Sequence, residues 1–289
     1  MPTNMLLDKR GLNRPADPGD SRSTTTSGLE EMGSALVSDR VGPVTTIIGM
    51  LAYRSSFDPH RCRGEVPVNV SLFSREVFWQ ALVAMREAFK AGLGIGSLVA
   101  VASEGQKLGE VMVPSGKVGF ATVSQIVVCG ALLKAGIPVD AKFGGILQIR
   151  HHEALRFVDL IEYTGSSLDP SEVFVAGKMT TVSKVIKEGN GKILAGLWEI
   201  PALAKPKAET TIEELQVVGM QGLITLGRTG QPVCELPVAM NKVGMVLADG
   251  LNPVAAALEA GIEVTNHAMS GVIDFEKLEC LWDGKSVRK

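Results

Sequence analysis

Apolar and polar residues alternate along residues 65–72, and this period of two predicts a β-strand with one solvated face. The apolar positions are Val66, Val68, Val70 and Leu72. Pro67 falls within the run and has no backbone N–H to donate to a neighbouring strand. We therefore expect this strand to lie at the edge of its sheet.

The pattern then changes to a helical period. Over residues 75–90 the apolar side chains recur at spacings of four and three, which predicts a helix with one apolar stripe. The stripe consists of Phe78, Leu82, Met85 and Phe89. Gly92 follows the last of them and predicts the end of the helix, and a further strand is predicted over 98–102.

The chain contains an internal repeat at an offset of about 125 residues. Lys117-Val118-Gly119 then falls on Lys242-Val243-Gly244, and Ala135-Gly136-Ile137 falls on Ala260-Gly261-Ile262. Each copy reads β-α-β followed by β-α-β, which is the order of a ferredoxin-like, split βαβ unit. Two copies predict an α+β fold in which two related ferredoxin-like halves form one domain, with a cleft between them.

The expected halves are residues 60–150 and 190–282, joined by an unrepeated linker or insert at 151–189. Within this scheme, strand 145–149 completes the first half and strand 271–275 completes the second. Residues 1–43 are polar and rich in Ser, Thr, Pro and Gly, so we expect a disordered tail there. Residues 283–289 form a second polar tail, and the folded domain spans 44–282.

Composition narrows the classes of function. Hydrophobic residues at 45% and charged residues at 21% exclude collagen-like and wholly disordered chains. A formal net charge of -2 disfavours autonomous binding to DNA or to anionic membranes. The sequence contains no signal peptide and no run long enough to span a membrane, so we expect a cytoplasmic protein. Its four cysteines form no C-x-x-C pair, so no zinc site is expected.

Motifs for catalysis are missing, which makes an enzyme the weaker hypothesis. His151 and His152 are adjacent, and on a strand they would point to opposite faces, so no metal site is predicted. Asn252-Pro253 predicts a helix start with Asn as the cap. The loop 163–170 gathers hydroxyl groups that suit either an ordinary turn or, with Lys142 or Lys178 nearby, a small dicarboxylate.

A succession of motifs along the chain resembles the regulatory domain of the archaeal nitrogen-regulation repressors, the NrpR family. The likeness covers about 44–281. Its motifs are Ala135-Gly136-Ile137-Pro138-Val139, Lys142-Phe143-Gly144-Gly145, Tyr163-Thr164-Gly165-Ser166-Ser167-Leu168-Asp169-Pro170, Gly189-Asn190-Gly191-Lys192-Ile193-Leu194, Glu199-Ile200-Pro201-Ala202, Gly250-Leu251-Asn252-Pro253-Val254-Ala255-Ala256 and Ala268-Met269-Ser270-Gly271.

The resemblance implies a transcriptional regulator. Members of the family repress nitrogen-assimilation genes, and 2-oxoglutarate binds the regulatory domain and releases the repressor from its operator. Full-length forms carry a winged helix-turn-helix before two copies of the domain. Because the segment before residue 44 is too short for such a head, we expect a co-repressor that forms a homo- or heterodimer, reaches DNA only through a helix-turn-helix-bearing homologue and contacts no membrane.

The resemblance also suggests where the effector binds, with no other cofactor and no metal. The expected effector-binding residues are Thr122, Ser124, Lys142, Phe143, Thr164, Gly165, Ser166 and Ser167. Two alternatives stay open: an interaction module that does not sense 2-oxoglutarate, and a small-molecule enzyme that uses the cleft between the halves.

Overall fold

The computed structural model describes residues 13–15, 22–24 and 44–280. Met1–Gly42 and Pro43–Lys289 are two separate units. In the first unit, β1 (Asn13–Pro15) and β2 (Arg22–Thr24) pair antiparallel. The rest of the predicted tail at 1–43, and the predicted C-terminal tail at 283–289, lie outside the described residues.

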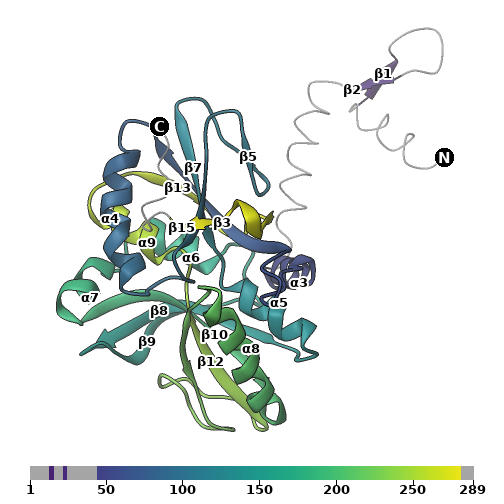
Figure 1. The fold of residues 1–289 in the computed structure, drawn as a ribbon, viewed down its shortest axis with the longest axis vertical. Coiled ribbons are helices and arrows are strands. Elements are labelled where there is room, and N and C mark those ends of the chain that lie inside the picture. Colours follow the sequence, from purple (N-terminus) through teal and green to yellow (C-terminus); the bar gives the residue numbers. More distant parts are fainter. Residues whose placement is uncertain (1–12, 16–21, 25–43, 281–289) are drawn as a thin grey trace. The chain divides into compact units, whose positions relative to one another are not determined.

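The second unit contains two antiparallel sheets (Figure 1). The first has the order β13-β3-β7-β4-β15, with β14 also paired to β3. The second has the order β11-β12-β10-β8-β9, and β5 and β6 form a separate hairpin. The bounds are β3 Glu65–Ser74, β4 Leu98–Ala102, β5 Lys107–Leu108, β6 Val111–Met112, β7 Lys117–Val123, β8 Asp140–Arg150, β9 Glu153–Glu162, β10 Gly191–Pro201, β11 Leu223–Leu226, β12 Lys242–Ala248, β13 Val264–His267, β14 Val272–Asp274 and β15 Glu279–Cys280.

Helices cover both sheets. Helices α4 and α9 pack against each other on the face of the first sheet that carries Phe73 and Phe120. Helix α5 packs against α8 and α3, and with α8 it covers the face of the second sheet that carries Met245. The bounds are α3 Val44–Arg54, α4 Phe78–Lys90, α5 Ile126–Lys134, α6 Pro170–Ala176, α7 Val182–Glu188, η1 Ala202–Ala204, α8 Lys205–Val217, α9 Asn252–Glu259 and η2 Phe275–Lys277.

The two copies of the repeat exchange their last helix and strand. The first copy runs β3, α4, β4, β7, α5, β8, and the second runs β10, α8, β11, β12, α9, β13. Three strands of the first copy are joined in their sheet by β13 of the second, and three strands of the second are joined by β8 of the first. If the four strands of each copy are numbered in chain order, each sheet has the order fourth, first, third, second, where the fourth strand comes from the other copy. This is the strand order of a ferredoxin-like unit.

This topology confirms the α+β class with two related ferredoxin-like halves, and it corrects one detail. The predicted strand 145–149 lies in β8 and completes the other sheet instead of its own. The predicted strand 271–275 corresponds to β14, whereas the exchanged strand of the second copy is β13. Each predicted half therefore contributes strands to both sheets.

The chain crosses between the sheets at two segments, the β7–α5 turn and the β12–α9 turn. These turns come into close contact, because a Cβ atom at Gly250 would lie 2.1 Å from the carbonyl oxygen of Val123 and 2.9 Å from Asn69 Nδ2. A side chain at position 250 would therefore push the two crossovers apart. We call these turns the first crossover (123–126) and the second crossover (248–251).

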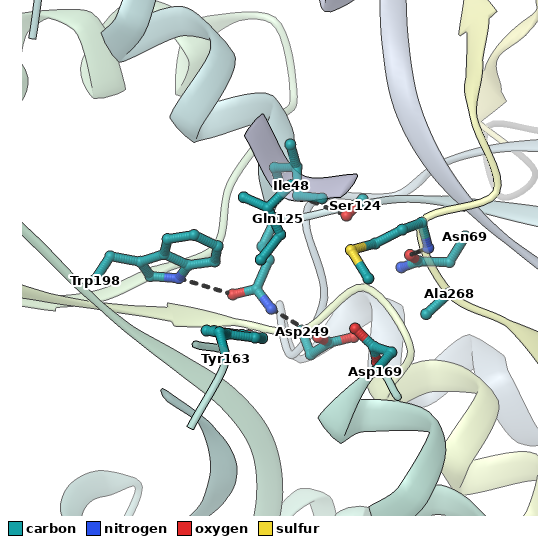
Figure 2. A pocket seen from close by; sticks show the side chains of 11 residues that line it. Ile48, Asn69, Ser124, Gln125, Tyr163, Asp169, Trp198, Asp249 and Ala268 are labelled. Atoms are coloured by element: carbon teal, nitrogen blue, oxygen red, sulfur yellow. Dashed lines mark hydrogen bonds between the residues drawn. The ribbon is translucent and has the colours of Figure 1, made fainter. Parts of the chain in front are cut away.

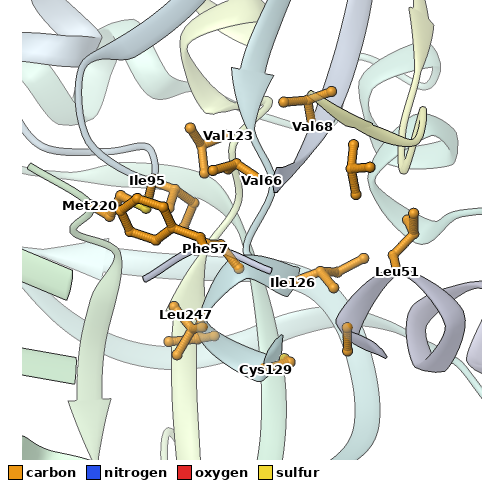
Figure 3. Packing of buried hydrophobic residues seen from close by; sticks show 14 of the residues in the cluster. Leu51, Phe57, Val66, Val68, Ile95, Val123, Ile126, Cys129, Met220 and Leu247 are labelled. Atoms are coloured by element: carbon orange, nitrogen blue, oxygen red, sulfur yellow. The ribbon is translucent and has the colours of Figure 1, made fainter. Parts of the chain in front are cut away.

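Apolar packing also joins the sheets. Figure 3 shows one buried cluster in which Leu51 of α3, Val66 and Val68 of β3, and Ile126 of α5 pack in the same core as Leu247 of β12. A second cluster joins Phe120 of the first sheet to α9 and to strands of the second sheet. Neither half has a core of its own.

Three local expectations are wrong. Strand β3 has no solvated face, because residues 66–73 are all buried. Strand β3 is internal, since it pairs with β7 on one side and with β13 and β14 on the other. Pro67 is tolerated because the strand beside it is interrupted between β13 and β14. Pro67 lies opposite Val272, the first residue of β14, and the next residue, Val68, donates its N–H to Gly271 in the interruption. His151 and His152 form the β8–β9 turn with φ of 50° and 64° instead of lying on a strand. The unrepeated segment supplies β9, α6 and α7.

Candidate functional site

A small polar pocket lies between the two crossovers (Figure 2). We call it the crossover pocket. The space that the centre of a water molecule can occupy is about 10 Å³, which is room for about one water. It is lined by Ile48, Asn69, Ser124, Gln125, Ile126, Tyr163, Asp169, Trp198, Asp249, Ala268 and Met269.

Gln125 occupies the centre of this pocket and links the two crossovers. Its Oε1 accepts a hydrogen bond from Trp198 Nε1 at 3.1 Å, and its Nε2 donates to Asp249 Oδ2 at 2.8 Å (Figure 2). An indole N–H can only donate, so Trp198 fixes the orientation of the Gln125 amide. The amide nitrogen then points to the second crossover, which must offer an acceptor.

Asp249 is that acceptor, and it is 5% exposed. Its Oδ1 accepts from the backbone N–H of Leu251 at 2.8 Å, and its Oδ2 also accepts from Ser171 Oγ at 2.7 Å. Burial raises the pKa of this carboxyl, while its hydrogen bonds from Leu251, Ser171 and Gln125 act in the opposite direction. One carboxylate thus holds together the starts of α5, α6 and α9.

The helix start at 252 is confirmed, but its capping residue is corrected. Asn252 does not cap the helix, because its start has no side-chain cap hydrogen bond. Asp249 instead accepts from the backbone N–H of Leu251, the residue just before α9. The Asn252 side chain is fully buried and bonds to the backbone of β10: its Oδ1 accepts from Leu194 N–H at 2.7 Å and its Nδ2 donates to Leu194 O at 2.8 Å. Asn252 therefore fastens α9 to the second sheet.

A second acid, Asp169, faces the same pocket. Its Oδ1 caps α6 by accepting from the backbone N–H groups of Ser171 at 2.8 Å and Glu172 at 3.1 Å. Burial, and then the negative charges of Asp249 and Glu172, raise the pKa of Asp169 to about 7. Asp169 therefore takes up a proton near neutral pH.

Aromatic rings close the pocket opposite the acids. Tyr163 is buried, and its ring centroid lies 5.5 Å from that of Trp198. Burial and the neighbouring carboxylates Asp169 and Asp249 raise the Tyr163 pKa well above its usual range, so the phenol stays neutral. None of the lining residues is Lys, Arg or His. The pocket is therefore filled by a hydrogen-bonded network of acidic character, Trp198–Gln125–Asp249–Ser171, which we call the latch.

The structure brings one of the eight predicted effector residues, Ser124, into this pocket. Ser124 begins the first crossover, where its Oγ accepts a long hydrogen bond of 3.4 Å from Ile126 N–H. Thr122 lies two residues earlier on β7, opposite Asn69. Its Oγ1 is buried and has no hydrogen-bond partner among the described residues.

The other predicted residues do not line the pocket. Lys142 and Phe143 are half-buried on β8, where the Lys142 carbonyl accepts from Tyr163 N–H at 3.1 Å. In the loop 164–167, the Ser166 hydroxyl bonds within the loop and the Ser166 carbonyl accepts from Val44 N–H at 2.9 Å. The loop is thereby fastened to the start of α3, and its remaining side chains, Thr164 and Ser167, are exposed.

Sequence reasoning missed Gln125, Asp169, Trp198 and Asp249. One signal could have found Asp249, because the repeat offset that aligns Lys117 with Lys242 also aligns Ser124 with Asp249. Both residues directly follow the third strand of their copy. A polar residue at the same point of both copies is the expected pattern for a site on the pseudo-symmetry axis.

Comparison with known proteins identifies the family. Residues 41–280 match the family described as NrpR regulatory domains NRD1 and 2. The chain belongs to this family of NrpR regulatory domains. It is 35% identical over 274 residues to the global nitrogen regulator NrpRI of Methanosarcina mazei, a match that covers 95% of this chain and 84% of the relative.

Two further comparisons support this family assignment. The global nitrogen regulator NrpR of Methanocaldococcus jannaschii is 28% identical over 224 residues, and the match covers 78% of this chain but 37% of that relative. A crystal structure of a nitrogen repressor-like protein from Methanococcus jannaschii aligns with a TM-score of 0.71 and 26% identity, covering 83% of this chain and 98% of that one. The NrpR fold is therefore shared across nearly the whole solved chain.

Among the residues that the structure describes, no group of His, Cys, Asp and Glu is arranged to hold a metal ion. Within the same residues, no helix combines the length and the apolar character that a membrane span requires.

We expect Asp169→Asn to change how stability depends on pH. Asn keeps the cap of α6, because its Oδ1 can still accept from the backbone. In the wild-type domain the folded state holds the Asp169 proton up to about pH 7, whereas an unfolded Asp loses it near pH 4. The free energy of unfolding of the wild type, relative to that of the Asn variant, should therefore fall by at most about 1.4 kcal/mol per pH unit between about pH 4 and about pH 7. Above about pH 7 this difference should stay constant.

Urea unfolding across this pH range measures the difference. Asp159→Asn is the matched control, since Asp159 lies on β9 and does not line the pocket. Parallel stability curves for the wild type and Asp169→Asn would contradict the assigned pKa.

Proposed function

We propose that this chain is a regulatory subunit in the control of nitrogen-assimilation genes, and that it acts as a co-repressor. Membership of the NrpR regulatory domain family over residues 41–280 is the observation that carries this proposal. The relatives are named as global nitrogen regulators, not as enzymes. The crossover pocket adds a physical basis for regulation, because it lies where the two halves exchange chain segments.

The effector in this proposal is 2-oxoglutarate, a dianion at neutral pH. It is far larger than the single water that the closed pocket admits. To bind between the crossovers it must separate Gln125 from Asp249. Such a ligand favours an open arrangement of the halves over the closed one, and its effect is limited by its difference in affinity for the two.

Charge makes this binding depend on protons. Asp169 and Asp249 repel a dianion, and no cation lines the pocket in the described part of the chain to offset them. Protonation of Asp169 removes one of these repulsions. Because its pKa is about 7 in the free domain, and an adjacent dianion raises it further, binding above neutral pH takes up a proton.

We expect calorimetry to detect 2-oxoglutarate binding that weakens as the pH rises. Above about pH 7 the association constant should fall by at most about tenfold per pH unit, and below it the dependence should be slight. Asp169→Asn should bind with little pH dependence, while the Asp159→Asn control should behave as the wild type. No heat and no thermal shift at millimolar ligand would exclude this chain as the sensor and favour the non-sensing interaction module.

A small-molecule enzyme is the less favoured alternative. The crossover pocket offers two carboxyl groups and a neutral phenol, but no His, Cys or Lys among its lining residues. Release of product from 2-oxoglutarate during prolonged incubation would support an enzyme and argue against a sensor.

The partner in the proposal is a helix-turn-helix-bearing repressor homologue, with which the chain forms a heterodimer or a larger assembly. The formal net charge of -2 gives the chain little attraction of its own for DNA.

In gel-shift assays, the chain alone should leave operator DNA unshifted, and it should produce a slower complex when the homologue is present. Addition of 2-oxoglutarate should dissociate that complex. A shift of DNA by the chain alone, or a homologue–DNA complex that the chain never joins, would overturn the co-repressor assignment.

A further inference from the structure

A basic hollow lies at the far end of the second sheet, and it shares no lining residue with the crossover pocket. Its volume is about 620 Å³, which is within the range of small-molecule sites. The walls come from the end of β8, the α6–α7 loop, α7 and the start of β10. The lining residues are Gln148, Ile149, Arg150, Lys178, Met179, Thr180, Thr181, Lys184, Asn190, Gly191 and Lys192.

Four of these side chains are cationic and none is acidic: Arg150, Lys178, Lys184 and Lys192. Only Lys184 has an ion-pair partner among the described residues, Glu188 at 3.8 Å on the exposed face of α7. The whole chain has a formal net charge of -2, so this excess of positive charge is local. Like charges gathered in one concave surface repel each other until an anion offsets them.

Two acids of other elements lie near this region: Glu153 of β9, which is opposite Arg150 in the β8–β9 register, and Glu259 of α9. Glu259, the last residue of α9, accepts hydrogen bonds from Thr180 Oγ1 at 2.8 Å and from the backbone N–H groups of Val182 at 2.7 Å and Ser183 at 2.8 Å. Its carboxylate therefore holds the start of α7 in place, and among the described residues it forms no ion pair with Lys178 or Lys192.

The walls of the hollow are held by backbone contacts. Thr181 N–H donates to the Lys192 carbonyl at 2.9 Å, and Lys192 N–H donates to Thr181 Oγ1 at 2.8 Å. A Cβ atom at Gly191 would lie 2.8 Å from Thr181 O, so glycine permits this close approach. Lys178 has a φ of 52°, a left-handed conformation, just after α6 ends. These backbone contacts therefore fix the segments of the hollow that carry Lys178 and Lys192.

We propose that the basic hollow binds a small anion with at least two carboxylate or phosphate groups. Several cations around one hollow favour a compact ligand with more than one negative group. The net negative charge of the chain disfavours an extended nucleic acid as the occupant. The proposal is independent of the effector proposal, because the hollow and the crossover pocket are separate.

Calorimetry at low salt tests the site with 2-oxoglutarate, citrate and pyrophosphate as probes. At least one probe should bind the full wild-type chain, and Lys178→Gln/Lys192→Gln should weaken it about tenfold or more, given two lost charged contacts. The matched control is Lys187→Gln/Lys207→Gln, which removes the same charge at two exposed positions outside the hollow. It should stay within about twofold of the wild type.

Three outcomes would overturn the proposal: no heat with any probe at millimolar concentration, equal weakening in both double variants, or binding of duplex DNA but of no small probe. The Asp169→Asn variant shows which of the two sites binds 2-oxoglutarate. If 2-oxoglutarate binding changes in Asp169→Asn and not in Lys178→Gln/Lys192→Gln, the effector proposal stands and the hollow is not its site; the reverse result assigns the ligand to the hollow.

Discussion

The carboxylate of Asp249 connects the parts on which the rest of the structure depends. It lies at the point where the second copy crosses to the first sheet, and it accepts hydrogen bonds from Leu251, Gln125 and Ser171. Gln125 lies at the corresponding crossover of the first copy. A single buried charge thus joins both exchanged segments and α6. An unpaired charge at such a depth would be costly, so these three donors are needed for the fold to tolerate it.

The exchange of segments explains why a latch at this place can regulate. Each sheet is completed by a helix and strand from the other copy, and both buried clusters contain residues of both sheets. A change in the relative position of the halves must therefore act on the crossovers. The twin acids Asp169 and Asp249 make the closed latch sensitive to charge, since the pKa of Asp169 is raised to about 7. In the proposed function, a small ligand or a proton acts on this element without unfolding either sheet.

Periodicity and the repeat were sufficient to predict most elements of the two copies in their order, although the last strand of the second copy was placed at β14 instead of β13. The apolar stripe of Phe78, Leu82, Met85 and Phe89 corresponds to α4, and strand 98–102 corresponds to β4. The partner of each fourth strand could not be predicted in this way. An apolar strand such as β8 suits either sheet, and only the packing of α5 on α8 selects one. The same limit explains the error at Pro67, because an internal strand with a broken neighbour looks like an edge strand in the sequence.

The site was predicted less completely than the fold. Ser124 was predicted from the resemblance to the NrpR family and lines the pocket, whereas the predicted residues of the loop 164–167 do not line it. Asp249 was not predicted, since an acidic residue just before a helix also suits the helix dipole and gives no sign of a further role. Gln125 carries no signal in the sequence. Its role depends on Trp198, 73 residues away along the chain, and on Asp249, 124 residues away.

Native-state hydrogen exchange tests the central claim, that the exchanged segments make both sheets one cooperative unit. The most protected amides of β3 and β7 in the first sheet should exchange with the same opening free energy as those of β10 and β12 in the second, within about 0.5 kcal/mol. The opening free energies of both sets of amides should also fall with urea concentration at the same slope. If one sheet opened at a free energy lower by about 2 kcal/mol or more while the other stayed protected, the two halves would be independent, and the account would be wrong.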